Sequence, residues 1–127
     1  MALSTFRIGH DGPDGKAIYL APVRFLPRGV SAAKRKEFFD VWFPLLAPSA
    51  ETLKAGQKAS AAPDDAKAWK RFADRYTKEM SAVAQSEAIR LLARVAAKTD
   101  LRIGCYCQNE ARCHRSLLRA MIDKAAD

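Results

Sequence analysis

Apolar and polar residues alternate between positions 5 and 10, which is typical of a short strand. A turn-rich sequence, Asp-Gly-Pro-Asp-Gly, follows at positions 11–15. Residues 17–26 are rich in side chains that favour strands, although Pro22 restricts part of this segment to an edge or a bulge. The first part of the chain therefore predicts two strands joined by a turn.

The next segment predicts one helix and then irregular chain. Ser31 can cap a helix over residues 32–42, whose apolar side is aromatic. Two prolines then break the pattern, so we expect irregular structure over residues 43–50. Residues 51–62 are polar and rich in alanine, and we expect them to form a connection.

Helical spacing of apolar residues begins at residue 64. The apolar face of this first helix consists of Trp69, Phe72, Tyr76 and Met80. A second amphipathic helix is predicted over residues 82–98, followed by a short apolar strand over 101–107. The chain then ends in an amphipathic helix that starts near Cys113.

The order of helix, strand and helix predicts a parallel α/β arrangement. We expect residues 1–127 to form a single domain with a small Rossmann-like, three-layer α/β fold, in which helices flank a short, mainly parallel sheet. Ligands of such sheets gather at the carboxyl ends of the strands. The loop over residues 107–112 would lie at this end and is the expected location of the functional site.

Composition and cysteine usage narrow the class of protein. All three cysteines lie between residues 105 and 113, which does not fit a secreted scaffold with an even number of distributed cysteines. The sequence contains neither a secretory signal nor an apolar segment of membrane-spanning length. We therefore expect a cytoplasmic protein without a membrane partner, whose oligomeric state the sequence does not indicate.

The net charge favours anionic partners. The chain has 22 Lys and Arg against 14 Asp and Glu, which gives a formal charge of +8. An anionic small molecule or a nucleotide would be attracted, and so would a nucleic acid. The basic residues form clusters rather than one stripe, so a nucleic-acid partner remains an alternative.

The predicted start of the last helix has the features of an anion site. Unpaired N–H groups and a positive dipole end lie at a helix N-terminus. Arg112 and Arg115 add permanent positive charge with bidentate geometry, and Ser116 adds a hydroxyl. In the alternative interpretation, Asn109 or Glu110 caps the helix and both arginines are solvated.

Cys113 is the candidate nucleophile of this site. A helix N-terminus and neighbouring cations favour a thiolate, so its pKa is expected to be lowered. His114 can act as a base, a ligand or a hydrogen-bonding residue. In the alternative interpretation, a small buried cysteine lies beside a structural histidine, so the sequence leaves open whether the protein is an enzyme.

A zinc site is a further alternative for the same segment, although the sequence does not require a cofactor. Cys105, Cys107, Cys113 and His114 have a composition that zinc accepts. Residues i and i+2 of an extended strand are about 6.6 Å apart, so both strand cysteines reach one ion only if the strand ends at Cys105. A phosphatase motif from Cys113 to Arg119 is disfavoured, because the residues between them are helical and bulky.

Two other groups of residues are candidates for ligand binding. Arg24 and Arg28 follow a predicted strand, where loops often present binding groups, although a solvated basic loop is the plainer interpretation. Arg75 and Tyr76 lie on a predicted helix, and the plain interpretation of Tyr76 is a residue at the edge of the core with a hydrated hydroxyl.

Four segments in order resemble the YeaO-like family of bacterial proteins, which is also called domain of unknown function 488. The resemblance covers about residues 16–122. Its segments are Val23–Ser31, Leu46–Ser49, Phe72–Met80 and Cys113–Ser116. The family commonly has Asp-Arg-Leu-Trp-Pro-Arg-Gly in the first segment, whereas here Val23 and Leu26 replace the aspartate and the tryptophan.

The resemblance implies a compact α/β fold but no established reaction. It also implies one cleft formed by Arg24, Arg28, Arg75, Tyr76 and the Cys-His-Arg turn. Our leading hypothesis is a protein that binds a phosphorylated or other anionic ligand at the helix start, where catalysis by Cys113 and His114 can occur. The alternatives are a nucleic-acid-binding module with structural or zinc-bound cysteines, and an interaction protein without a ligand.

Overall fold

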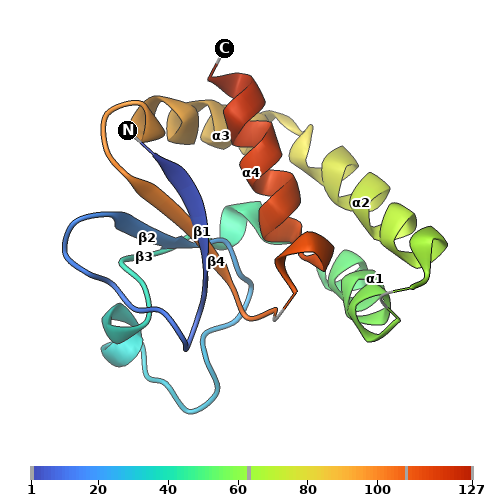
Figure 1. The fold of residues 1–127 in the computed structure, drawn as a ribbon, viewed down its shortest axis with the longest axis horizontal. Coiled ribbons are helices and arrows are strands. Elements are labelled where there is room, and N and C mark those ends of the chain that lie inside the picture. Colours follow the sequence, from blue (N-terminus) through green and yellow to red (C-terminus); the bar gives the residue numbers. More distant parts are fainter. Residues whose placement is uncertain (1, 63, 108, 127) are drawn as a thin grey trace.

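A sheet of four parallel strands forms the centre of the protein, shown in Figure 1 as a computed structural model that describes residues 2–62, 64–107 and 109–126. The strands are β1 (Leu3–Arg7), β2 (Ile18–Ala21), β3 (Val41–Trp42) and β4 (Leu101–Cys105). Their order in the sheet is β1-β4-β2-β3, and each of these pairings is parallel. The expected short, parallel α/β sheet is therefore confirmed.

The helices are α1 (Ala50–Ala61), α2 (Ala66–Met80), α3 (Val83–Ala96) and α4 (His114–Ala125). Three 3₁₀ turns, η1 (Lys34–Glu37), η2 (Pro44–Leu46) and η3 (Glu110–Arg112), complete the elements. Residues of α2, α3 and α4 pack on one face of the sheet around Leu101 and Ile103. On the other face, Phe6 and Tyr19 pack against Phe39, which follows η1. The helical layer and this thinner layer enclose the sheet.

The prediction of a helix over residues 32–42 is wrong, because only η1 forms there before β3 begins. Val41 pairs with Leu20 at the edge of the sheet. The Trp42 indole Nε1 donates a hydrogen bond to the main-chain oxygen of Val23 over 2.8 Å. Sheet pairing and this hydrogen bond therefore outweigh the local capping signal of Ser31.

The prediction of an irregular connection over residues 51–62 is also wrong, because these residues form most of α1. Ser49 is the N-cap of this helix, and its side chain accepts a hydrogen bond from the main-chain N–H of Thr52. The helix packs against α2, where a Cβ on Gly56 would lie 2.8 Å from the Phe72 ring. The lack of a side chain at this position allows α1 to approach α2 closely.

Gly104 provides a similarly close approach in the sheet. It pairs with Phe6 across β1 and β4, and a Cβ at this position would lie 2.3 Å from the Phe6 ring. Gly104→Ala should therefore destabilise the protein by about 1 to 3 kcal/mol through overpacking. Urea denaturation would measure the loss.

Gly12→Ala is the matched control, because a Cβ there would meet only the main-chain oxygen of Glu37 at 3.4 Å. If the stability of Gly104→Ala equalled that of the control, the proposed clash with Phe6 would be wrong.

Glu79 on α2 holds the start of α1. Its carboxylate accepts hydrogen bonds from the main-chain N–H of Ser49 over 3.0 Å and from the Thr52 hydroxyl over 2.7 Å. Burial alone would raise the pKa of Glu79, but hydrogen bonds from Ser49 and Thr52 and the charge of Arg75 outweigh it, so the pKa is lowered. The ionised carboxylate therefore stabilises the folded protein.

Glu79→Gln should lower the melting temperature at pH 7. A lowered folded pKa contributes stability above the unfolded pKa, and this contribution is lost as the pH falls through the folded value. The difference between the wild type and the variant should therefore shrink below about pH 4.5. Thermal unfolding from pH 3 to pH 7 would check this, and a difference that stayed constant with pH would contradict it.

Candidate functional site

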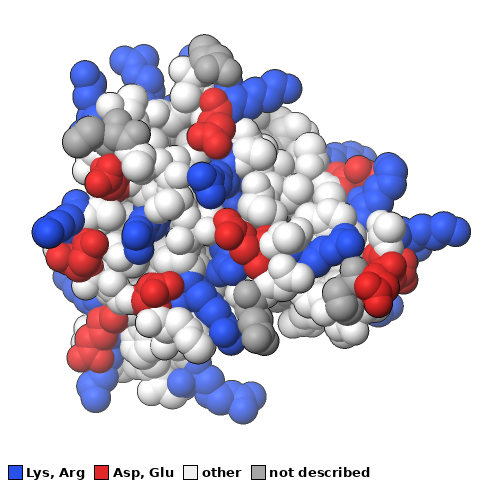
Figure 2. Space-filling view, in the orientation of Figure 1, with Lys and Arg blue, Asp and Glu red and all other residues white. Residues whose placement is uncertain are grey.

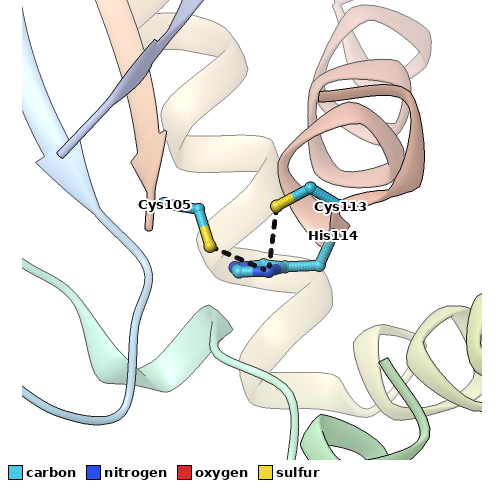
Figure 3. Close-up of side chains that lie close together, drawn as sticks. All are labelled: Cys105, Cys113 and His114. Carbon is cyan, nitrogen blue, oxygen red and sulfur yellow. Dashed lines mark hydrogen bonds between the residues drawn. The ribbon is translucent and has the colours of Figure 1, made fainter. Parts of the chain in front are cut away.

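Cys105, Cys113 and His114 meet at the carboxyl end of β4 (Figure 3). Cys105 is the last residue of the strand, Cys113 is the N-cap of α4, and His114 is its first helical residue. Both sulfur atoms point toward His114 Nδ1, at 3.7 Å from Cys105 and 3.8 Å from Cys113. The predicted location of the site is thus the place where these side chains converge.

Cys107 joins the same group. Its Sγ lies 3.7 Å from Sγ of Cys105, although the two residues are only two positions apart. This distance is possible because β4 ends at Cys105 and the chain is no longer extended beyond it. We call Cys105, Cys107, Cys113 and His114 the Cys-His cluster.

The imidazole of His114 has a defined tautomer. Its Nε2 lies 2.9 Å from the main-chain oxygen of Pro22, and a carbonyl oxygen can only accept a hydrogen bond. Nε2 therefore carries the proton, and the lone pair of Nδ1 faces the thiols. Burial lowers the pKa of His114 and outweighs the hydrogen bond to Pro22, which favours the charged ring. The ring is thus a neutral acceptor toward the sulfurs.

The pKa values of the three thiols depend on one another. The pKa of Cys105 lies well below its usual value, because Cys107 and Cys113 hydrogen-bond to its sulfur. The pKa values of Cys107 and Cys113 are raised, first because of this interaction with Cys105. The expected lowering of the Cys113 pKa is therefore wrong. Once one thiol has ionised, its charge opposes the ionisation of its neighbours, which outweighs the helix terminus at Cys113.

Arg115 and Ser116 make contacts with the main chain. The buried Arg115 guanidinium donates hydrogen bonds to the main-chain oxygens of Phe6 and Cys105, over 2.8 and 3.3 Å. The hydroxyl of Ser116 donates to the main-chain oxygen of Cys113 over 2.8 Å. Arg115 therefore connects α4 to the ends of β1 and β4, beside the cluster.

A cavity of about 560 Å³ opens onto the cluster. The three cysteines and His114 form one wall, and α1 forms another. Gln57 and Ser60 of α1 and Asn109 supply polar groups, and Phe72 supplies an aromatic surface. Arg112 also lines the cavity, and its guanidinium lies over the Trp69 ring at 5.4 Å. This cavity is large enough for a small metabolite.

The other predicted site residues lie outside the cavity wall. Arg24 and Arg28 are exposed on the segment after β2. The phenol of Tyr106 donates a hydrogen bond to the main-chain oxygen of Phe25 over 2.8 Å, which holds this segment near the end of β4. Burial raises the pKa of Tyr106 to about 12, with a smaller contribution from Cys105, so the phenol keeps the proton that it donates.

Arg75 and Tyr76 on α2 face different surroundings. Arg75 is exposed and borders a separate hollow between α1 and α2. Tyr76 is fully buried, and its hydroxyl donates to the main-chain oxygen of Leu46 over 2.7 Å. Its ring lies edge-on to His114 at 5.4 Å. Tyr76 therefore packs against the imidazole of His114. Arg24, Arg28 and Arg75 do not line the cavity at the cluster.

Sequence reasoning missed two parts of the site. The carbonyl of Pro22 is a main-chain group, and no side-chain pattern could indicate its contact with His114. The wall formed by α1 was missed because residues 51–62 were expected to be a connection. A signal for this helix was present, since Ser49 follows Pro48 and precedes an alanine-rich segment.

The surface charge shows no single basic stripe on the face in Figure 2, where basic and acidic side chains are interspersed. Nucleic-acid binding therefore stays a prediction.

Within the described residues, no helix is both long and apolar enough to cross a membrane.

The hydrogen bond to Pro22 makes the tautomer of His114 testable. In the reduced, metal-free protein, Nε2 should be protonated and Nδ1 unprotonated at pH 7, because Nε2 donates to the carbonyl. Long-range ¹H–¹⁵N NMR spectra distinguish the two ring nitrogens. The exposed His10 is the internal comparison. A proton fixed on Nδ1 would contradict the arrangement.

Comparison with known proteins identifies one family. The family model described as "DUF488-N3a: Active DUF488-N3 subclade" matches residues 3–126. This match confirms the resemblance to the YeaO-like, DUF488 proteins. Neither a curated protein nor a solved structure matches the chain.

Proposed function

The chain belongs to the DUF488 family, in its active DUF488-N3 subclade, and we propose that its cavity binds a small anionic ligand beside a reactive cysteine. The ligand class is a phosphorylated compound, such as a nucleotide, or another small anion. The observation that supports this proposal is the opening of three thiols and a neutral imidazole onto one cavity that Arg112 also lines.

The preference for an anion follows from the charges around the cavity. Arg112 contributes a permanent positive charge, and no Asp or Glu is among the described residues that line the cavity. The start of α4 lies at the cluster, and none of the described side chains caps its first turn. Its free N–H groups and positive dipole end favour a negative group. An anion would therefore be attracted toward the thiols.

Cys105 is the nucleophile in this proposal, with His114 as the base. Cys105 Sγ lies 3.7 Å from both the Cys107 sulfur and His114 Nδ1, and either of them can accept its S–H hydrogen. His114 Nδ1 takes the thiol proton as the sulfur bonds to an electrophilic atom of the ligand. The leaving group departs with the bonding electron pair and receives that proton from His114. Cys113, which also faces Nδ1, is the alternative nucleophile.

Two alkylating agents of similar size test both parts of the proposal. Iodoacetate is anionic and iodoacetamide is neutral, so the ratio of their rates measures the preference of the reactive thiol for an anion. In reduced, chelator-treated protein this ratio should exceed the ratio for glutathione. Peptide mapping should place the first label on Cys105, and inorganic phosphate at fixed ionic strength should slow labelling and raise the melting temperature.

Arg112→Gln should lower this ratio about fivefold, because a charge interaction of about 1 kcal/mol changes a rate by that factor. Arg94→Gln is the matched control, since it removes one positive charge from α3, which does not line the cavity. Arg24→Gln and Arg28→Gln test whether the segment after β2 also attracts the anion. A ratio equal to that of glutathione, together with no effect of phosphate, would rule out the anion site.

A further inference from the structure

We propose that the Cys-His cluster is also a zinc site, in which Sγ of Cys105, Cys107 and Cys113 and Nδ1 of His114 are the four ligands. Three thiolates and one imidazole form a donor set that structural zinc sites use. This inference is independent of the anion site, although both use the same sulfur atoms. The metal-bound and the reactive forms of the protein would therefore exclude each other.

The distances among Cys105, Cys113 and His114, and the distance from Cys105 to Cys107, are close to those of a zinc tetrahedron. Zinc bonds of about 2.3 Å to sulfur and about 2.0 Å to nitrogen place two sulfurs about 3.8 Å apart, and a sulfur and a nitrogen about 3.5 Å apart. The structure has 3.7 Å between Cys105 and Cys107, and 3.7 and 3.8 Å from His114 Nδ1 to Cys105 and Cys113. The ligand atoms of Cys105, Cys113 and His114 all lie within 4.8 Å of one another. An ion can be held with small adjustments of the side chains.

His114 already has the outer hydrogen bond that zinc-bound histidines usually make. Its Nε2 donates to the main-chain oxygen of Pro22 over 2.9 Å, which leaves Nδ1 as the ligand nitrogen. The ring is packed against Tyr76 and cannot turn freely. The orientation of the imidazole is therefore set by contacts other than those with the sulfurs, and it points its lone pair at them.

The backbone that carries the ligands is also held in place. Cys105 ends a central strand, and Cys113 and His114 begin a helix of 12 residues. Arg115 hydrogen-bonds to the main-chain oxygen of Cys105, so it connects the two ligand-bearing elements. Three thiolates and Zn²⁺ have a net charge of −1, which the buried Arg115 and the positive end of α4 offset. The site is thus preorganised sterically and electrostatically.

Zinc would change the properties of the protein in two ways. A site with four protein ligands is closed, and coordination to zinc lowers the nucleophilicity of each sulfur. Zinc also links the end of β4 to the start of α4, so binding adds to the stability of the folded chain. The metal would therefore protect the cluster and suppress its thiol chemistry.

Cobalt(II) is the probe for this site, because tetrahedral cobalt with thiolate ligands has intense visible and sulfur-to-metal charge-transfer bands. Titration of the reduced full chain should produce these bands with one ion per chain, and Zn²⁺ should displace them. Cys107→Ser is the first variant, since Cys107 is half-buried and its replacement should leave the fold intact. It should lower the charge-transfer intensity by about a third and weaken zinc binding at least tenfold.

Cys105→Ser, Cys113→Ser and His114→Ala should each weaken binding further, while His10→Gln is the matched control because His10 is exposed and is not one of the grouped ligand residues. Circular dichroism of each variant would show that it is folded. The inference is overturned if cobalt has only the weak bands of a hydrated ion, or if Cys107→Ser binds zinc as tightly as the wild type.

The proposal of a zinc site and the proposal of an anion site can be tested separately. Added Zn²⁺ should stop alkylation of Cys105 by iodoacetamide, and a chelator should restore it. If cobalt shows thiolate bands but the chelator-treated protein has no preference for iodoacetate, the anion site alone is wrong. If the preference is present without thiolate bands, the zinc site alone is wrong.

Discussion

The pairing of β4 between β1 and β2 is the constraint on which the site depends. This pairing requires Gly104, because the Phe6 ring occupies the space where a side chain would lie. It also fixes Cys105 at the end of an inner strand, where the buried Arg115 binds the main-chain oxygens of both Phe6 and Cys105. The guanidinium of Arg115 thus joins β1 and β4 to α4, whose start carries Cys113 and His114. The position of the Cys105 sulfur therefore follows from the sheet.

The parts of the fold that were predicted correctly are those with a strong local pattern. The face formed by Trp69, Phe72, Tyr76 and Met80 predicts α2, and the short apolar segment before Cys105 predicts β4. Residues 32–42 and 51–62 were predicted incorrectly for opposite reasons. In the first, a distant partner, Leu20, draws Val41 into the sheet. In the second, a local cap at Ser49 was present but lay among prolines that suggested irregular chain.

The site shows the same division between local and distant information. The sequence places Cys113 and His114 at a helix start, and the structure confirms this position. It could not indicate that Pro22 would orient the imidazole, because that contact spans 92 positions and uses a main-chain oxygen. Nor could it separate Arg112, which lines the cavity, from Arg115, which is buried in main-chain contacts. Both arginines have the same chemistry, and only their helical positions distinguish them.

Burial of the sulfurs explains why the Cys-His cluster can exist either without a metal or with a bound metal ion. A buried sulfur anion is costly unless other groups donate to it or a cation binds it. Without a metal, hydrogen bonds from the thiols of Cys107 and Cys113 lower the pKa of Cys105, while the pKa values of Cys107 and Cys113 are raised. With a divalent cation, all three sulfurs can ionise, since the ion compensates most of their charge. The neutral His114 suits both states, because its Nδ1 lone pair accepts either a proton or a metal. The same geometry that places a reactive sulfur beside the cavity therefore also makes that sulfur a metal ligand, and the availability of zinc would decide which chemistry the cavity can perform.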